Sequence, residues 1–313
     1  MSYPKIACLT LDMEPDYGAP QGRIRLLENP EYFERYVSIL RKHGGKVTMF
    51  TVTSLFERYG EHFRQLAGQI PLEYAAHSYS HDPQNADSRE EIEASLHALR
   101  QFDAQCLPGY RAPIGQITSA GLERLLEAGF VYDASLYPSY RPGKYGYANL
   151  YMPNTPFRVT RGAQSLIEFP FTSLSGVRIV FGLSYVKLLG WGFYSRLWKS
   201  FGLPDIVLAL SHPHDFYFHE LTAYHPASLE KWAFSRHARH AFDYYDKMLA
   251  ELRRQGYEFH FVSEAYHCAQ SQPDLLEIPL TAWGNKNRNY LPKRRPSANF
   301  TLRVRCRSST RKN

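Results

Sequence analysis

The stretch Ile6-Ala7-Cys8-Leu9-Thr10-Leu11-Asp12-Met13-Glu14-Pro15-Asp16 joins an apolar run to three carboxylates. The run Ile6–Leu11 has the length and composition of a buried strand. On a strand, positions 12 and 14 share one face, so Asp12 and Glu14 are expected to point the same way. Two such carboxylates can divide the work of holding a metal and acting as a base.

Apolar or aromatic runs alternate with helical patterns outward from this stretch. The predicted strands are Ile6–Leu11, Val47–Val52, Leu72–Ala76, Phe130–Tyr132, Leu166–Phe169, Ile206–Leu210 and Tyr257–Val262. The predicted helices are Pro30–His43, Ser88–Phe102, Ser119–Ala128 and Leu229–Gln255. This alternation predicts an α/β fold with a parallel sheet, and seven or eight repeats favour a barrel. In a barrel, chemistry is expected at the C-terminal ends of the strands.

Two histidines follow the third predicted strand, in Ala76-His77-Ser78-Tyr79-Ser80-His81-Asp82. Histidines four residues apart can form a metal pair where the backbone is turned or helical. With one carboxylate, His77 and His81 give the three-ligand set of a catalytic zinc site, which leaves room for water. The alternative is a pair of surface or hydrogen-bonded histidines.

Two more polar groups follow at Gly109-Tyr110-Arg111-Ala112-Pro113-Ile114-Gly115 and Leu210-Ser211-His212-Pro213-His214-Asp215. Arg111 could hold a carboxylate by a bidentate pair, and the turn after it could aim a backbone N–H at an oxyanion. His212 ends an apolar strand, where a core histidine is unusual. An imidazole near its reference pKa of ~6.5 suits a general acid at neutral pH.

In order along the chain, these groups resemble the motifs of the polysaccharide deacetylase family, also called the NodB-homology or carbohydrate esterase family 4 enzymes. The first resembles a Thr-Phe-Asp-Asp motif, whereas the second and third match His-Ser/Thr-x-x-His and Arg-x-Pro-x-Gly in full. Val131-Tyr132-Asp133-Ala134-Ser135 resembles the fourth motif, and the strand end at Leu210–His212 resembles the fifth. The resemblance spans about residues 5–215.

The resemblance implies a distorted (β/α)7 TIM-like barrel and hydrolysis of an N-acetyl amide on an amino sugar. It implies a divalent metal, zinc first, with cobalt or nickel as alternatives. The implied roles are Asp12 as base, Glu14, His77 and His81 as ligands, His212 as acid, Arg111 orienting Asp12, Asp133 tuning His212, and the Ile114 amide at the oxyanion.

The acidic motif departs from the family pattern, because Met13 separates the two acids. It resembles an Asp-x-Glu branch of the family. Glu14 is therefore the expected ligand and Asp16 the fallback. His214 stands where related branches often have an aromatic residue, and we expect it to line the substrate pocket. The stretch Tyr137–Thr160 is rich in Tyr, Pro, Gly and Asn and predicts a long surface loop, and Tyr137 is expected to contribute to substrate binding.

The net charge of +7 comes from the end of the chain. Residues 278–313 carry ten basic and no acidic residues, which leaves 27 basic and 30 acidic residues before them. We expect a catalytic barrel over residues 1–275 and a basic tail over residues 276–313. A solvated tail is the first interpretation, contact with an anionic membrane is the alternative, and no specific nucleic-acid partner is expected.

The stretch Val180–Leu203 is aromatic, and its only charges are positive. Packing against the barrel is its expected fate, with a sugar-stacking wall or a membrane interface as alternatives. No secretory signal is visible, and four widely spaced cysteines favour free thiols, so a cytoplasmic location is expected, with peripheral contact at the inner membrane face as an extension.

Three rival functions stay open from the sequence. One is deformylation or deacylation of a lipid-linked amino sugar, which the aromatic stretch and the basic tail would favour. A second is metal-free hydrolysis of a small cyclic amide, in which His77 and His81 would contact substrate. A third is a non-catalytic glycan-binding barrel, which would need a disrupted site. We expect an N-acetylated glycan or a lipid-linked sugar as the substrate.

Overall fold

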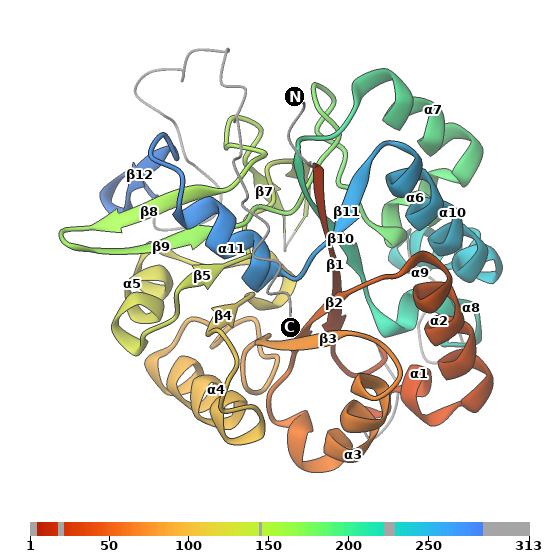
Figure 1. Cartoon of the computed structure of the whole chain (residues 1–313), viewed down its shortest axis with the longest axis horizontal. Coiled ribbons are helices and arrows are strands. Elements are labelled where there is room, and N and C mark those ends of the chain that lie inside the picture. Colours follow the sequence, from red (N-terminus) through yellow and green to blue (C-terminus); the bar gives the residue numbers. More distant parts are fainter. Residues whose placement is uncertain (1–4, 18–21, 144–145, 222–228, 284–313) are drawn as a thin grey trace, which may run out of the picture.

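The computed structural model describes residues 5–17, 22–143, 146–221 and 229–283. A ten-stranded sheet forms its centre, in the order β10-β1-β2-β3-β4-β5-β9-β8-β12, with β11 also paired to β1 (Figure 1). Every pairing in this sheet is parallel except that of β8 with β9. Its strands are β1 Lys5–Met13, β2 Val47–Thr51, β3 Leu72–Ala76, β4 Gly109–Tyr110, β5 Tyr132–Asp133, β8 Phe157–Arg161, β9 Gln164–Glu168, β10 Ile206–Ser211, β11 Tyr257–Phe259 and β12 Glu277–Pro279.

Two isolated bridges connect the far side of the sheet back to β10. Ser173 pairs with Val180 in antiparallel fashion, and Gly182 pairs with Leu210 in parallel fashion. Between them, the Phe181 N–H donates to the Thr172 carbonyl. The ring of strands is therefore continued by short, irregular pairings, which is the distorted (β/α) barrel that the sequence predicts.

Helices surround the strands (Figure 1). The helices are α1 Arg25–Glu28, α2 Pro30–His43, α3 Leu55–Ala67, α4 Arg89–Phe102, α5 Ser119–Ala128, α6 Leu183–Leu189, α7 Trp191–Phe201, α8 Phe218–Leu221, α9 Leu229–Ser235, α10 Ala241–Arg254 and α11 Val262–Gln270. The amphipathic pattern of α2 places Phe33, Tyr36, Val37 and Leu40 in the core. Asn29 caps its start with a side-chain oxygen, and Gly44 ends it in the left-handed conformation.

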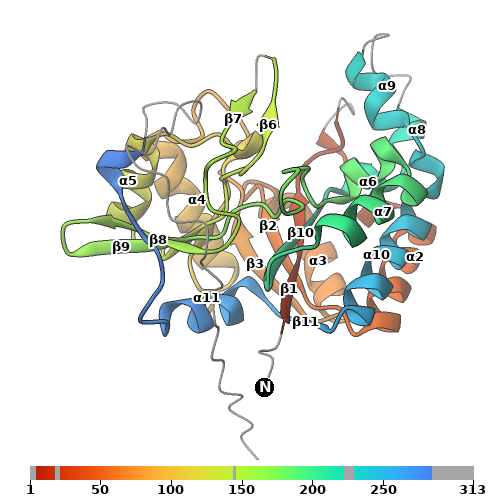
Figure 2. The ribbon, with the colours of Figure 1, turned by 90° about the horizontal axis from the view of Figure 1, so that it is seen from above.

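The strand direction decides where functional side chains gather. In Figure 2, the antiparallel hairpin of β6 Tyr140–Arg141 and β7 Tyr147–Ala148 rises on the same side of the barrel as α8 and α9, opposite the start of β1. The C-terminal ends of the parallel strands face this side. It is therefore the face on which a barrel carries its chemistry.

The helix predicted over Leu229–Gln255 is interrupted. The structure has α9, a 3₁₀ turn at Ala238–His240, and then α10. The break falls at His237, whose φ is 51° and whose Nδ1 lies 2.7 Å from the Lys187 carbonyl. A tertiary hydrogen bond thus overrides a locally helical sequence. The strand predicted to reach Val262 likewise ends at Phe259, because Val262 begins α11.

The aromatic stretch Val180–Leu203 forms α6 and α7 and packs against the barrel. Phe181, Leu183, Val186, Tyr194 and Trp198 are fully buried. Packing, the expected fate of this stretch, is confirmed for these side chains. Membrane contact stays a prediction, and no helix among the described residues is long and apolar enough to cross a membrane.

The cysteines differ from one another. Cys8 and Cys106 are free thiols, as expected, whereas Cys268 is disulfide-bonded, so the free-thiol prediction is wrong there.

The basic residues of the predicted tail begin at Lys286 and lie outside the described residues. Strand β12, beyond the predicted boundary at residue 275, pairs with β8. The domain boundary stays a prediction.

Gly109 provides a packing test next to the site. A Cβ at this position would lie 1.8 Å from the ring of Tyr132 on β5. Gly109→Ala is expected to lower the free energy of unfolding by about 1–3 kcal/mol, as overpacking does. The control is Gly192→Ala in α7, where a Cβ meets nothing within 4 Å. Urea unfolding that gives equal stabilities for both variants would contradict the packing argument.

Candidate active site

Three side chains form a candidate metal-ligand set, called the metal set below, at the C-terminal end of the barrel. Glu14 follows β1, His77 follows β3, and His81 lies four residues further on. The Glu14 Oε2 is 2.6 Å from His81 Nε2 and 3.6 Å from His77 Nε2. One ligand atom from each residue lies within 4.8 Å of the others. The structure therefore brings together the three ligands that the sequence predicts.

The His77 ring is oriented by a hydrogen bond to the backbone. It is 2 % exposed, and its Nδ1 lies 2.8 Å from the carbonyl oxygen of Arg111. A carbonyl only accepts, so Nδ1 carries a proton, and Nε2 is the ring nitrogen that faces Glu14. This arrangement is the one in which a histidine binds a metal through Nε2.

The charges within the set favour ionised glutamate. Burial acts to raise the pKa of Glu14, but His81 and His77 outweigh it and hold that pKa well below its usual value. The His81 Nε2 lies close to Glu14, yet it forms no hydrogen bond of regular geometry with any described residue. Two imidazole nitrogens and a carboxylate converging in this way suit a borderline-soft divalent cation such as zinc.

Asp12 lies beside the ligand set and is fixed by Arg111. Its Oδ1 accepts a hydrogen bond from Arg111 Nη1, and both side chains are buried. Arg111 also donates to the Ala134 carbonyl and lies between the rings of Phe50 and Phe171, at 3.8 and 4.4 Å. The predicted orienting contact between Arg111 and Asp12 is present. The second oxygen of Asp12 remains directed at the site.

His212 directly follows β10 and faces the second oxygen of Asp12. Its Nε2 is 3.8 Å from Asp12 Oδ2, and its Nδ1 is 3.1 Å from Asp215 Oδ2. Asp215 is held in turn by Lys187 Nζ at 2.9 Å, with both side chains fully buried. Burial acts to lower the pKa of His212, but Asp215 outweighs it and raises that pKa to about 9. This pKa favours the protonated imidazole at neutral pH.

The carboxylate partner of His212 is Asp215 and not Asp133. Asp133 lies on β5, where its Oδ1 accepts from the Ser135 hydroxyl at 2.6 Å. Its register partner on β9 is Glu168, also fully buried. Burial raises the pKa of both carboxyls. The side-chain partners of Asp133 are Ser135 and Glu168, whereas the carboxylate in contact with His212 is Asp215, so the tuning contact predicted for Asp133 is corrected to Asp215.

The fallback ligand Asp16 lies away from the metal set. Its two carboxylate oxygens accept from the Arg25 N–H at 3.0 Å and the Tyr217 hydroxyl at 2.5 Å. Burial raises its pKa to about 6. Asp16 therefore fixes the loop after β1, and the acidic member of the set is Glu14.

The three predicted substrate-binding positions lie around this centre. His214 Nδ1 is 3.6 Å from Glu14 Oε1, and its ring lies 5.0 Å from that of His212. Ile114 has φ 52° in the turn after Arg111. Tyr137 is buried and stacks on Phe171 with ring centroids 3.8 Å apart. Their roles in binding substrate stay predictions.

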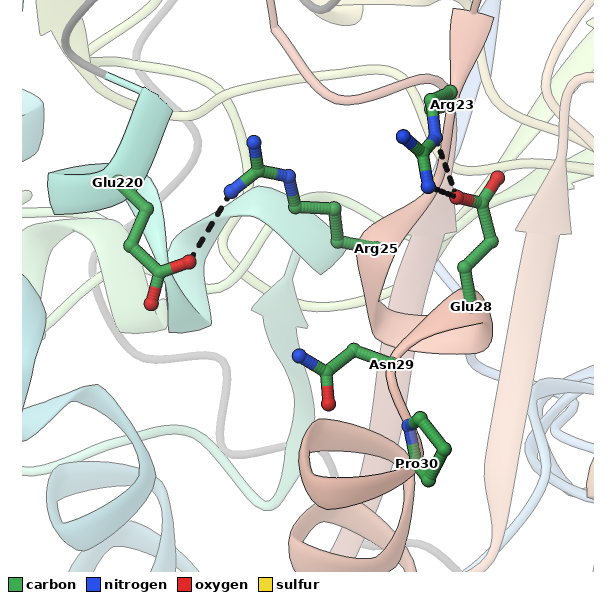
Figure 3. A pocket seen from close by; sticks show the side chains of 6 residues that line it. All are labelled: Arg23, Arg25, Glu28, Asn29, Pro30 and Glu220. Carbon is green, nitrogen blue, oxygen red and sulfur yellow. Dashed lines mark hydrogen bonds and ion pairs between the residues drawn. The ribbon is translucent and has the colours of Figure 1, made fainter.

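A pocket of about 420 Å³ lies apart from these residues (Figure 3). Its two arginines are already in ion pairs, Arg23 with Glu28 at 2.5 Å and Arg25 with Glu220 at 3.1 Å. None of the residues that line it belongs to the metal set. This pocket is therefore separate from the candidate metal set at the strand ends.

The sequence profile described as "Polysaccharide deacetylase" matches residues 3–132, which carry Asp12, Glu14, His77, His81 and Arg111. Over these residues the chain is similar to the polysaccharide deacetylase family. No curated protein sequence matches the chain.

Solved structures share the fold of this chain at low identity. A putative polysaccharide deacetylase from Mycobacterium smegmatis is 18% identical, with 89% of this chain and 97% of that chain covered and a TM-score of 0.51. The peptidoglycan N-acetylglucosamine deacetylase Bc1960 is 15% identical, with 85% and 90% covered and a TM-score of 0.50. A 4-alpha-glucanotransferase from Thermococcus litoralis is 12% identical, with 88% and 42% covered and a TM-score of 0.53. The fold therefore hosts different chemistry, and the site must decide the activity.

Proposed function

We propose that this chain is a metal-dependent hydrolase that removes the N-acetyl group of an amino sugar in a glycan or a glycan precursor. The observation that carries the proposal is the position of Asp12 Oδ2. It lies 4.0 Å from His77 Nε2, a metal ligand in this proposal, and 3.8 Å from His212 Nε2. One carboxylate oxygen thus faces both the metal set and a proton donor.

Glu14, His77 and His81 would hold the cation, which supplies Lewis-acid polarisation of the amide carbonyl and a more acidic water when bound. Among divalent cations, zinc is the one we expect this donor set to bind. Asp12 Oδ2 takes the proton of the attacking water, because Arg111 occupies the other oxygen and keeps the carboxylate in place. The turn at Ile114 offers a backbone N–H for the oxyanion.

His212 completes the reaction by donating its Nε2 proton to the nitrogen of the leaving sugar amine as the carbon–nitrogen bond breaks. The Asp215 carboxylate accepts from Nδ1–H and stabilises the charged imidazole. Asp12 and His212 therefore have complementary tasks, one as proton acceptor and the other as proton donor. That opposition is typical of an acid–base pair.

A second candidate is deacylation, including deformylation, of a lipid-linked amino sugar. Phe193 and Phe201 of α7 are 54% and 41% exposed, and Lys199 on the same helix is exposed. Exposed aromatic and basic side chains of this kind favour contact with a lipid surface. The cytoplasmic or membrane-peripheral location expected from the sequence stays a prediction.

The test is metal content together with acetate release from N-acetylated glucosamine oligomers, for wild type, His77→Ala and the exposed control His97→Ala. Wild type and His97→Ala are expected to hold about one zinc-like ion each and to release acetate. His77→Ala is expected to lose both, because it removes one of three ligands.

Other outcomes decide between the candidates. Release of formate but not acetate, or release only from a lipid-linked substrate, would favour the second candidate. A wild-type protein that binds neither zinc nor cobalt and releases no acyl group would exclude metal-dependent hydrolysis. It would favour a metal-free hydrolase or a glycan-binding barrel.

A further inference from the structure

Glu91 in the first turn of α4 contacts the segment that carries two metal-ligand candidates. The sequence Ser88-x-x-Glu91 predicts a reciprocal capping box, and Ser88 Oγ does accept from the Glu91 N–H at 3.2 Å. The Glu91 carboxylate, however, points to residues 79–80. Its Oε1 accepts from the Tyr79 N–H at 3.1 Å, the Ser80 N–H at 2.5 Å and the Ser80 hydroxyl at 2.7 Å.

The segment bound by Glu91 is a strained turn. His77 and His81 stand at its two ends, and Ser78 and His81 have φ values of 60° and 64°. Left-handed backbone is uncommon for residues other than glycine and persists where the surroundings hold it. Inside the turn, the His81 N–H donates to Ser78 Oγ at 3.0 Å. The contacts with Glu91 attach this turn to a regular helix.

We propose that Glu91 is a positioning residue that holds the turn between His77 and His81 in the geometry required for metal binding. This rests on the proposed function in one respect, namely that Glu14, His77 and His81 are the ligands. Three donors converge on one carboxylate oxygen, and charge-assisted hydrogen bonds are stronger than neutral ones. The first turn of a helix also favours a negatively charged side chain, and Glu91 lies in the first turn of α4.

Glu90 is a matched control for Glu91. Both residues lie in the first turn of α4, so either substitution removes one favourable charge from the helix terminus. Glu90 is exposed, whereas Glu91 is partly buried against the turn. A difference between the two variants therefore reports the contacts with residues 79–80 and not the stability of the helix.

The experiment measures the Kd for Zn²⁺ by competition with a chelator, in wild type, Glu91→Ala, Glu91→Gln and Glu90→Ala. Glu91→Ala is expected to weaken zinc binding by about 10–100-fold, the range found for outer partners of metal ligands. Glu91→Gln keeps a carbonyl acceptor and is expected to recover part of the loss. Glu90→Ala should bind zinc as wild type does. At saturating zinc, kcat is expected to stay within a few fold for all four proteins, because the ligands and the acid–base pair are intact.

Equal Kd values for Glu91→Ala and Glu90→Ala would overturn the inference and leave the proposed function standing. A wild-type protein that binds no zinc would overturn both. Zinc binding that depends on Glu91, in a protein that hydrolyses no amide, would support the positioning role and reject only the proposed function. Melting temperatures of the metal-free proteins are measured alongside, and Glu91→Gln provides the comparison if Glu91→Ala fails to fold.

Discussion

Asp12→Asn is expected to lower kcat by about 10²–10⁴-fold while the protein keeps its metal. The amide that replaces the carboxylate can still accept from Arg111 Nη1 through its oxygen. It cannot take a proton from water, because an amide is not a base at neutral pH. The loss should therefore fall on kcat, whereas zinc affinity changes little.

The comparison for this variant is Asp16→Asn. Asp16 is a buried carboxylate near Glu14 in the sequence, but it binds the Arg25 N–H and the Tyr217 hydroxyl. The Asp16→Asn protein is expected to retain zinc and most of the wild-type kcat. Loss of zinc in Asp12→Asn would show Asp12 to be a ligand and not the base. Loss of zinc in Asp16→Asn would return Asp16 to the ligand set.

The strands that carry the site could be predicted from the sequence because each is an apolar run ending in a polar group. β1, β2, β3 and β10 lie within a few residues of their predicted ranges. β4 was not predicted, because two residues carry no periodicity, although Arg111 directly after it was singled out from its motif. Motif spacing thus identified site residues where the strand pattern was too short to find.

The buried charges behind the site could be predicted only in part. Asp215 lies three residues after His212 in a turn led by Pro213, and this spacing is a signal that local geometry could have used. Lys187 gave no signal. A lysine in an aromatic, amphipathic helix is expected in solvent, whereas here it is fully buried against Asp215. Such a contact depends on how α6 packs on the end of β10, which no local pattern encodes.

Lys187→Met is expected to lower the free energy of unfolding by about 3–5 kcal/mol, as removal of one partner of a buried ion pair does. Methionine fills a similar volume but removes the ammonium group from the Asp215 carboxylate, which keeps the His212 imidazole as its charged partner. It also removes the hydrogen bond from Lys187 Nζ to the Asp215 carbonyl, at 2.8 Å. Urea unfolding measures the loss, with the exposed Lys199→Met expected to stay within about 0.5 kcal/mol of wild type.

The double variant Lys187→Met/Asp215→Asn separates the two roles of this pair. Removing the second charge is expected to recover part of the stability, because no uncompensated buried charge remains. The activity of the double variant should stay below that of wild type, because His212 then lacks the carboxylate that accepts from its Nδ1 and stabilises its charged form. A double variant no more stable than Lys187→Met would show that lost packing, and not the unpaired charge, causes the destabilisation. Wild-type activity in the double variant would show that His212 donates its proton without help from Asp215.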